Sequence, residues 1–300
     1  MRNWVHLPKP GVSPSTGIWG LWVDAQSKPS VYIQSDGLYT LEPSGWVRTL
    51  KSPGLPDEAP LQTEFFEPVL RNSTGIYRWT PESAWTPIAS FAEPRSYLNA
   101  VRDSLGRLWV FQNDTVDLAM IHGFSFQRVP LRADAGSKIL NIFSRKDGMV
   151  VATNLGLLQR KDADTEWALR SWQDWGLGAI DRIHQIDDHT LILSVRPDSK
   201  PITGFWVLDL VTQTKKFWPA GGTFYSFNDV RKTSKGEIIM ALDFSIYRTD
   251  GVSYAEIFSQ KDLNSLPQIP GTFLLIFAIR IDANDRLWFH IATGLVRIDL

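Results

Sequence analysis

Cysteine is absent from this chain of 300 residues. Its absence excludes disulfide bonds, thiolate metal sites and cysteine nucleophiles, so stability has to come from packing. The redox compartment is left open, because a protein of either compartment can lack cysteine.

A surplus of charge of either sign is also absent. Lys and Arg together number 31 against 32 Asp and Glu, which gives a formal net charge of -1. A surface that binds nucleic acid normally carries a basic field. We therefore expect no nucleic-acid partner.

No long apolar run occurs in the chain. The longest candidate, residues 273–279, has the length of a strand, and the first eight residues lack the apolar core of a signal peptide. We expect no direct membrane insertion. The protein is expected to be cytoplasmic if Met1 is the native start, and extracytoplasmic if a leader was removed.

Motifs that carry catalysis or metal binding are missing too. The five histidines are scattered, and neither a Gly-x-Ser-x-Gly elbow nor a phosphate-binding loop occurs. The acidic segment 282–285 lacks the Gly and Glu that complete a calcium loop, and a turn explains it better. We predict no catalytic residue, no metal and no cofactor, although an active site of dispersed side chains is left open.

What the chain does contain is a repeated phrase, a glycine followed by apolar or aromatic residues. Its copies begin at Gly37, Gly75, Gly156, Gly204 and Gly294, with degenerate versions at Asp117 and Ser245. The first and last copies are 257 residues apart over six intervals, a mean of about 43. This period is typical of four short strands and their turns.

Turns and strand-like runs recur around each phrase. Clusters of Asp, Asn and Gly, such as residues 103–106 and 282–285, suit tight turns. Short apolar runs such as Leu108–Val110 and Leu287–Phe289 follow them, as expected for buried strands. The pattern predicts an all-β protein, a single seven-bladed β-propeller domain over residues 1–300 with four-stranded antiparallel blades.

The seventh unit stops after its third strand. The segment Trp4–Leu7 resembles Trp46–Thr49, a predicted fourth strand. We expect the N-terminal strand to join the C-terminal blade, which closes the ring and removes an exposed sheet edge. The second unit contains prolines and no clear first turn, so a six-bladed ring with an irregular insertion is the alternative.

Residues 282–299, reading DANDRLWFHIATGLVRID, resemble the two-component regulator propeller repeat, with partial matches at 103–110 and 146–160. The resemblance implies a bacterial, sensor-like propeller. Propellers of that family form extracytoplasmic sensor regions of membrane-bound histidine kinases, and some recognise glycans. This sequence has no membrane helix and no kinase, so a separate partner would have to receive the signal.

We place the candidate site where the first strands of the blades begin, around the central channel on one face. Polar and aromatic residues recur there, suited to bonding a polar ligand and stacking on it. The predicted ligand-binding residues are Trp19, Tyr97, Asn99, Lys138, Asn141, Asp181, Arg182, Tyr225 and Asn228. The competing interpretation is that the asparagines satisfy backbone groups and the aromatics belong to the core.

Thirteen tryptophans suggest a recognition role beyond packing. Those without a place in the repeat, and so available for recognition, are Trp19, Trp22, Trp172 and Trp175. The leading function is a non-catalytic, monomeric binding propeller that recognises a protein partner or a small polar ligand such as an oligosaccharide.

The alternative function is a small-molecule lyase or lactonase. Streptogramin lyases are seven-bladed, with repeats resembling Trp-Phe-Thr-Glu. Here the corresponding residues Trp288, Phe289 and His290 lack the acid.

Overall fold

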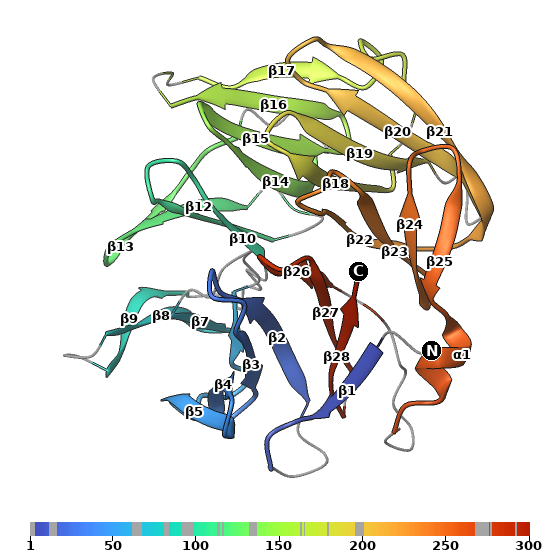
Figure 1. Cartoon of the computed structure of the whole chain (residues 1–300). Helices are drawn as coiled ribbons and strands as arrows, with labels where there is room; N and C mark the ends of the chain where they lie inside the picture. Colours follow the sequence, from blue (N-terminus) through green and yellow to red (C-terminus); the bar gives the residue numbers. More distant parts are fainter. Residues whose placement is uncertain are drawn as a thin grey trace. The chain divides into compact units, whose positions relative to one another are not determined.

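The computed structural model describes residues 4–11, 17–61, 68–80, 84–91, 99–112, 115, 117–131, 137–162, 164, 166–178, 180–195, 201–267, 276, 278–291 and 293–300. Within them, 28 strands form seven four-stranded antiparallel sheets (Figure 1). The predicted seven-bladed β-propeller is confirmed. The six-bladed alternative is wrong, because the irregular second unit forms a sheet of its own, β6-β7-β8-β9.

Each sheet orders its strands as the repeat predicts, with the phrase in the third strand. The first strands are β2 (Ile18–Val23), β6 (Ala59–Pro60), β10 (Asn99–Arg102), β14 (Ile139–Arg145), β18 (Arg182–Asp187), β22 (Phe227–Lys232) and β26 (Ile279–Ile281). The second strands are β3 (Pro29–Ile33), β7 (Val69–Asn72), β11 (Leu108–Phe111), β15 (Gly148–Thr153), β19 (Thr190–Val195), β23 (Ile238–Leu242) and β27 (Arg286–Ile291).

The outer half of each sheet consists of the third and fourth strands. The third strands are β4 (Gly37–Glu42), β8 (Gly75–Thr80), β12 (Leu118–His122), β16 (Gly156–Lys161), β20 (Ile202–Asp209), β24 (Ser245–Thr249) and β28 (Gly294–Asp299). The fourth strands are β5 (Gly45–Lys51), β9 (Ala84–Ser90), β13 (Ser125–Arg128), β17 (Ala168–Ser171), β21 (Thr214–Phe224), β25 (Tyr254–Phe258) and β1 (Trp4–Pro8). Blades 1 to 7 are numbered by their first strands in chain order.

The predicted closure of blade 7 is confirmed. Strand β1 pairs antiparallel with β28, in a register that runs from Trp4 opposite Ile298 to Pro8 opposite Gly294. Figure 1 shows the two strands side by side, near opposite ends of the chain.

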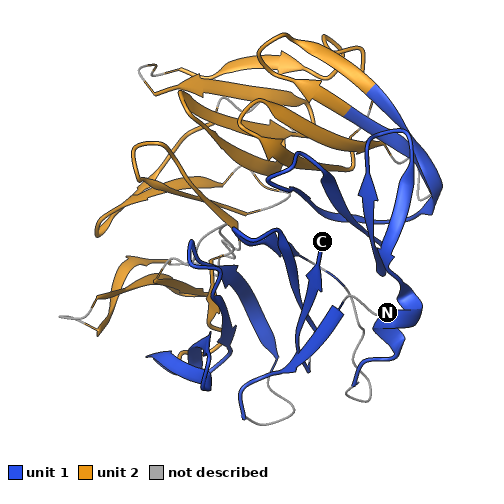
Figure 2. Ribbon diagram, viewed as in Figure 1, with its two compact units in different colours: residues 1–54, 196–206, 217–300 blue, residues 55–195, 207–216 orange. Residues whose placement is uncertain are grey.

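The chain divides into two compact units (Figure 2). Unit 1 comprises Met1–Gly54, Arg196–Trp206 and Phe217–Leu300, and it holds blades 1, 6 and 7. Unit 2 comprises Leu55–Val195 and Val207–Lys216, and it holds blades 2, 3 and 4. The strands of blade 5 are divided between the two units.

Close backbone approach explains the glycine of the repeated phrase. A Cβ atom on Gly156 would lie 2.3 Å from the carbonyl oxygen of Arg170, in the fourth strand of the same blade. A Cβ atom on Gly294 would lie 2.1 Å from the carbonyl oxygen of Leu7. Any side chain there would push the fourth strand away, so the phrase marks where that strand passes.

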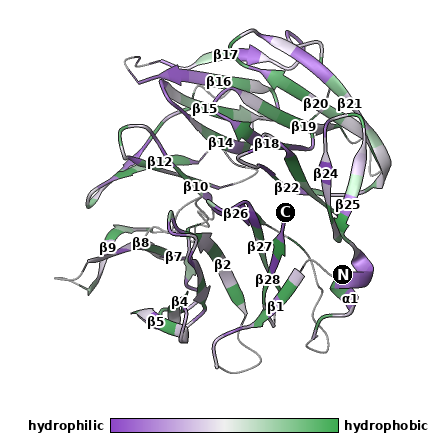
Figure 3. Cartoon of the chain, viewed as in Figure 1, coloured by the Kyte–Doolittle hydropathy of each residue, from purple (hydrophilic) through white to green (hydrophobic). Residues whose placement is uncertain are grey.

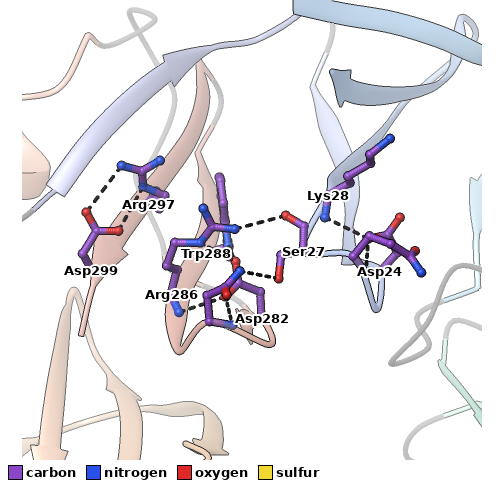
Figure 4. Close-up of polar contacts among 10 residues, drawn as sticks. Asp24, Ser27, Lys28, Asp282, Arg286, Trp288, Arg297 and Asp299 are labelled. Atoms are coloured by element: carbon purple, nitrogen blue, oxygen red, sulfur yellow. Dashed lines mark hydrogen bonds and ion pairs between the residues drawn. The ribbon is translucent and has the colours of Figure 1, made fainter. Parts of the chain in front are cut away.

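A buried aspartate organises the turn between the first two strands of blade 7. Asp282 accepts hydrogen bonds from Arg286 Nε at 2.7 Å and from Trp288 Nε1 at 3.0 Å (Figure 4). The guanidinium of Arg286 also lies over the Trp288 ring. The same turn contacts blade 1, because Asn284 Nδ2 donates to the Ser27 hydroxyl at 3.0 Å.

The turn of blade 3 repeats this arrangement in unit 2. Asp103 accepts from Arg107 Nε at 2.6 Å and from Trp109 Nε1 at 2.7 Å, and its side chain is fully buried. Arg107 reaches the next blade through Asp162, at 2.9 Å. One carboxylate thus folds the turn, orients a core tryptophan and positions the arginine that joins two blades.

Replacing Asp103 by alanine is expected to reduce the free energy of unfolding by about 2–4 kcal/mol. The substitution leaves the buried indole N–H of Trp109 without its acceptor and removes one of the two carboxylates that pair with Arg107, so that only Asp162 is left to it. Urea unfolding followed by tryptophan fluorescence measures the loss. The matched control is Asp147→Ala at the turn of blade 4, where the carboxylate is 56 % exposed and the expected change is within about 0.5 kcal/mol. Equal losses in the two variants would contradict this account.

Hydrophobic residues run along the strands, whereas the short helix α1 (Gln260–Asn264) is largely hydrophilic (Figure 3). The helix begins at Ser259 with a capping box to Asp262 and buries only Leu263. The sequence pattern did not predict it. In the described part of the chain, no helix is long and apolar enough to span a membrane.

Candidate functional site

The predicted site residues lie at or near the beginnings of first strands, but in both units. Unit 2 contains Asn99, Lys138, Asn141, Asp181 and Arg182. Unit 1 contains Trp19, Tyr225 and Asn228. Tyr97 lies outside the described residues. That all nine form one pocket stays a prediction, and the geometry is given for each unit separately.

In unit 2, side chains tie the first strand of blade 4 to that of blade 5. Asn141 Nδ2 donates to the carbonyl oxygen of Ile183 at 3.0 Å, and Gln185 Nε2 donates in the opposite direction to the carbonyl oxygen of Ser144 at 2.9 Å. The first strand of a sheet has one unpaired edge, and these amides satisfy carbonyl groups on it. Asn141 therefore has a structural task, as the competing interpretation proposed.

Unit 1 repeats the link between blades 6 and 7 with an aspartate. Asp229 Oδ2 accepts from the backbone N–H of Ile279 at 3.0 Å and lies 3.2 Å from a guanidinium nitrogen of Arg231. Asp229 and Asn141 each accept from the following backbone N–H and each follow a β-bulge. The two are structurally equivalent, so the residue of blade 6 that corresponds to Asn141 is Asp229 and not the predicted Asn228. The one-residue difference arises from the β-bulges, which the repeat pattern of the sequence does not reveal.

The strand entrances are held by polar residues of the turns between second and third strands. Asp243 accepts from the backbone N–H groups of Tyr225 and Ser226, at 2.9 Å and 2.7 Å. Its carbonyl oxygen accepts from Asn228 Nδ2 at 3.1 Å. Asn154 performs the same task in blade 4, where its Oδ1 accepts from the backbone N–H of Lys138 at 2.6 Å.

Sequence reasoning missed both of these turn residues. Each lies two positions before the repeated phrase, at Ser245 for Asp243 and at Gly156 for Asn154. That spacing was the available signal, because Asp and Asn favour turns in which they bond nearby backbone groups.

Two predicted aromatic residues are exposed at these entrances in unit 1. The side chain of Trp19 in β2 is 42 % exposed, and that of Tyr225, ahead of β22, is 51 % exposed. Phe244, in the turn after β23, is a further exposed aromatic residue that the sequence did not single out. In unit 2, two exposed cations lie at adjacent first strands: Lys138 directly ahead of β14, and Arg182 as the first residue of β18.

The other three tryptophans expected to be free for recognition are buried, which corrects that prediction. Trp22, Trp172 and Trp175 are all less than 5 % exposed. Trp172 Nε1 donates to the carbonyl oxygen of Thr153, and the guanidinium of Arg170 covers the ring of Trp175. These three rings are buried at positions that do not belong to the repeated pattern. The absence of a tryptophan from the repeat therefore did not indicate that it is exposed.

A half-buried histidine lies near the strand entrance of blade 7. His290 is in β27, opposite Leu295 of the third strand. Burial lowers the pKa of His290 to about 4, and the charge of Arg280 acts in the same direction. The imidazole is therefore neutral in the folded protein, while in the unfolded chain its pKa returns to about 6.5.

Acidification is expected to destabilise the protein through His290. Below pH 6.5 His290 is protonated in the unfolded chain but stays neutral in the folded protein. The free energy of unfolding therefore falls until the pH reaches about 4. Between pH 7 and pH 5, wild type should lose about 1–2 kcal/mol more than His290→Gln. Urea unfolding at both pH values tests this. The control, His122→Gln, alters an exposed histidine and should follow wild type; a pH dependence unchanged in His290→Gln would refute the assignment.

Metal ligands do not cluster among the residues that the structure describes. No group of three or more His, Asp or Glu side chains there could hold a metal ion. The predictions that the protein uses no metal, no cofactor and no catalytic residue stay predictions.

Comparisons with known proteins support the fold. No family model matches the chain, and no curated protein matches it. Virginiamycin B lyase from Staphylococcus aureus, solved as an inactive variant with quinupristin, superposes with a TM-score of 0.70 at 12 % identity over 99 % of both chains. YCF48 bound to D1 peptide gives a TM-score of 0.68 at 12 % identity over 100 % of this chain and 98 % of that one.

A third structure connects with the sensor-like resemblance. The extracellular domain of BT4673 from B. thetaiotaomicron, described as a one-component system, gives a TM-score of 0.65 at 10 % identity. The match covers 99 % of this chain and 40 % of that one. At such identities these similarities show the β-propeller fold alone.

Proposed function

We propose that the protein is a non-catalytic binding module and that its strand entrances present aromatic side chains to a protein partner. The observation that carries the proposal is the exposure of Trp19 and Tyr225 at the starts of first strands in unit 1. Large aromatic side chains are usually buried. Their exposure on a rigid scaffold is typical of interface residues, among which Trp, Tyr and Arg are enriched.

The backbone beneath Tyr225 supports this proposal, because it is fixed before any partner arrives. The carboxylate of Asp243 accepts hydrogen bonds from the backbone N–H groups of Tyr225 and Ser226. The backbone N–H of Asp243 donates in turn to the carbonyl oxygen of Ser226. A binding residue that is already ordered loses less conformational entropy on association. Tyr225 is thus suited to anchor a partner.

A protein partner fits these residues better than a sugar does. Oligosaccharide sites combine aromatic stacking with side chains that hydrogen-bond the hydroxyl groups. Two of the three asparagines predicted for that task donate instead to backbone carbonyls, Asn141 to Ile183 and Asn228 to Asp243. Within unit 2, the exposed cations Lys138 and Arg182 suit acidic side chains of a protein.

Two similarities are consistent with this role. The structure of YCF48 bound to D1 peptide belongs to a protein of the same fold that holds a peptide. The repeat at residues 282–299 resembles two-component regulator propellers, and BT4673 has an extracellular propeller. We therefore include sensing through a separate protein in the proposal.

Peptides selected from a display library on the wild-type protein are expected to bind Trp19→Ala and Tyr225→Ala at least about tenfold more weakly, because each substitution removes an interface anchor. Biolayer interferometry measures the affinities, and circular dichroism confirms folding. The matched control is Phe217→Ala in β21, an aromatic residue 41 % exposed on a fourth strand, which should bind as wild type does.

Other outcomes would reject the proposal. Glycans that bind saturably while no peptide does would favour the oligosaccharide reading. Turnover of a small molecule would favour the lyase alternative. Peptide affinities that fall equally in Phe217→Ala would remove the strand entrances from the site.

A further inference from the structure

The edge of β28 is occupied by a strand that comes from the other end of the chain. Strands β26, β27 and β28 are consecutive and pair with one another, whereas β1 pairs only with β28. The last interaction of blade 7 is therefore between two segments almost 300 residues apart in sequence.

Strand β1 is attached by its pairing with β28, by side-chain packing, and by a hydrogen bond from Trp46 Nε1 of blade 1 to the carbonyl oxygen of Pro8 at 2.7 Å. Trp4 packs edge-on against Phe258 of blade 6, with ring centroids 5.8 Å apart, and Leu7 packs on the opposite side with the cluster shared with blade 1. The outward-facing Val5 is 43 % exposed, and none of the five residues of β1 is fully buried.

Strand β28, whose edge pairs with β1, is more deeply buried than β1 is. Four residues of β28 are buried, including Leu295 and Val296, which are completely inaccessible to solvent. Six register pairs hold β28 to β27. The β28 edge thus has supports that do not involve β1, and an unpaired, apolar strand edge accepts another strand readily.

Nine residues separate Pro8, the last residue of β1, from Ile18, the first residue of β2. A chain of that length spans up to about 30 Å when extended. It contains two further prolines and two glycines. None of its described residues takes part in a strand pairing.

From this geometry we propose that the β28 edge is a strand-acceptor site and that β1 of a second copy of this chain can replace the chain's own β1. Reciprocal replacement produces a symmetric dimer by strand exchange, in which each β1 makes the same contacts with β28 as it makes within a single chain. The occupant is a second copy because its β1 is complementary to this edge residue by residue, from Trp4 opposite Ile298 to Pro8 opposite Gly294.

The absence of cysteine allows a direct test in the full-length protein. Val5 lies opposite Arg297 in the pairing, and neither side chain is fully buried. Neighbouring residues of paired strands are close enough for a disulfide bond. Chains carrying only Val5→Cys are mixed with chains carrying only Arg297→Cys, and oxidised glutathione is added at a temperature below unfolding. A disulfide-linked dimer then forms if β1 of one copy lies on β28 of another.

The expected yield of that dimer is at least about tenfold above the yield from a mixture of Leu105→Cys and Arg297→Cys chains. Leu105 is 58 % exposed in a turn of blade 3, so this control measures random collision. A single chain with both Val5→Cys and Arg297→Cys should form the bond internally and remain monomeric.

Dimer yields no higher than the collision control, with the internal disulfide forming in the double variant, would overturn the proposal. If either single variant fails to fold, as judged by circular dichroism, the pair Trp4→Cys and Ile298→Cys tests the same register. An internal disulfide that fails to form in both pairs would also overturn it.

Discussion

The first strand of each blade has one edge without a neighbouring strand in its own sheet, and the backbone groups on that edge must find other partners. Between blades 4 and 5 and between blades 6 and 7, side chains of the adjacent first strand supply such partners. Asn141 donates to Ile183 and Gln185 donates to Ser144 in unit 2, while Asp229 accepts from Ile279 in unit 1. Leaving such groups buried and unbonded would cost free energy, so these first-strand positions serve the structure first.

This constraint decides which residues are available for recognition. The amide and carboxylate side chains at the strand entrances bind backbone, and Asp243 and Asn154 fix the incoming segments. What these interactions leave exposed is aromatic and cationic, at Trp19, Tyr225 and Arg182. The proposed function rests on these exposed aromatic and cationic side chains.

The opposite ends of the blades obey a similar rule with different residues. In blades 3 and 7 a buried aspartate joins a turn, an arginine and a core tryptophan, and the turn then contacts the next blade. Blade 6 makes the corresponding contact through Ser234, whose backbone N–H donates to Asp285 at 2.8 Å. Polar turns therefore link blades 3 and 4 in unit 2 and blades 6, 7 and 1 in unit 1.

The sequence by itself predicted seven units, with six as the alternative, together with the strand order and the closure of blade 7, because these follow from a period of about 43 residues and from the likeness of residues 4–7 to a fourth strand. It also predicted the residue types at the strand entrances. Only the tertiary structure decided their tasks: the one-residue bulge that aligns Asn141 with Asp229, the burial of Trp22, Trp172 and Trp175, and the hydrogen bonds that occupy Asn228. A repeat records what every blade shares, whereas burial and hydrogen bonding at these positions depend on contacts particular to one blade, such as that of Asn228 with Asp243, or on the next blade, as for Asn141 with Ile183.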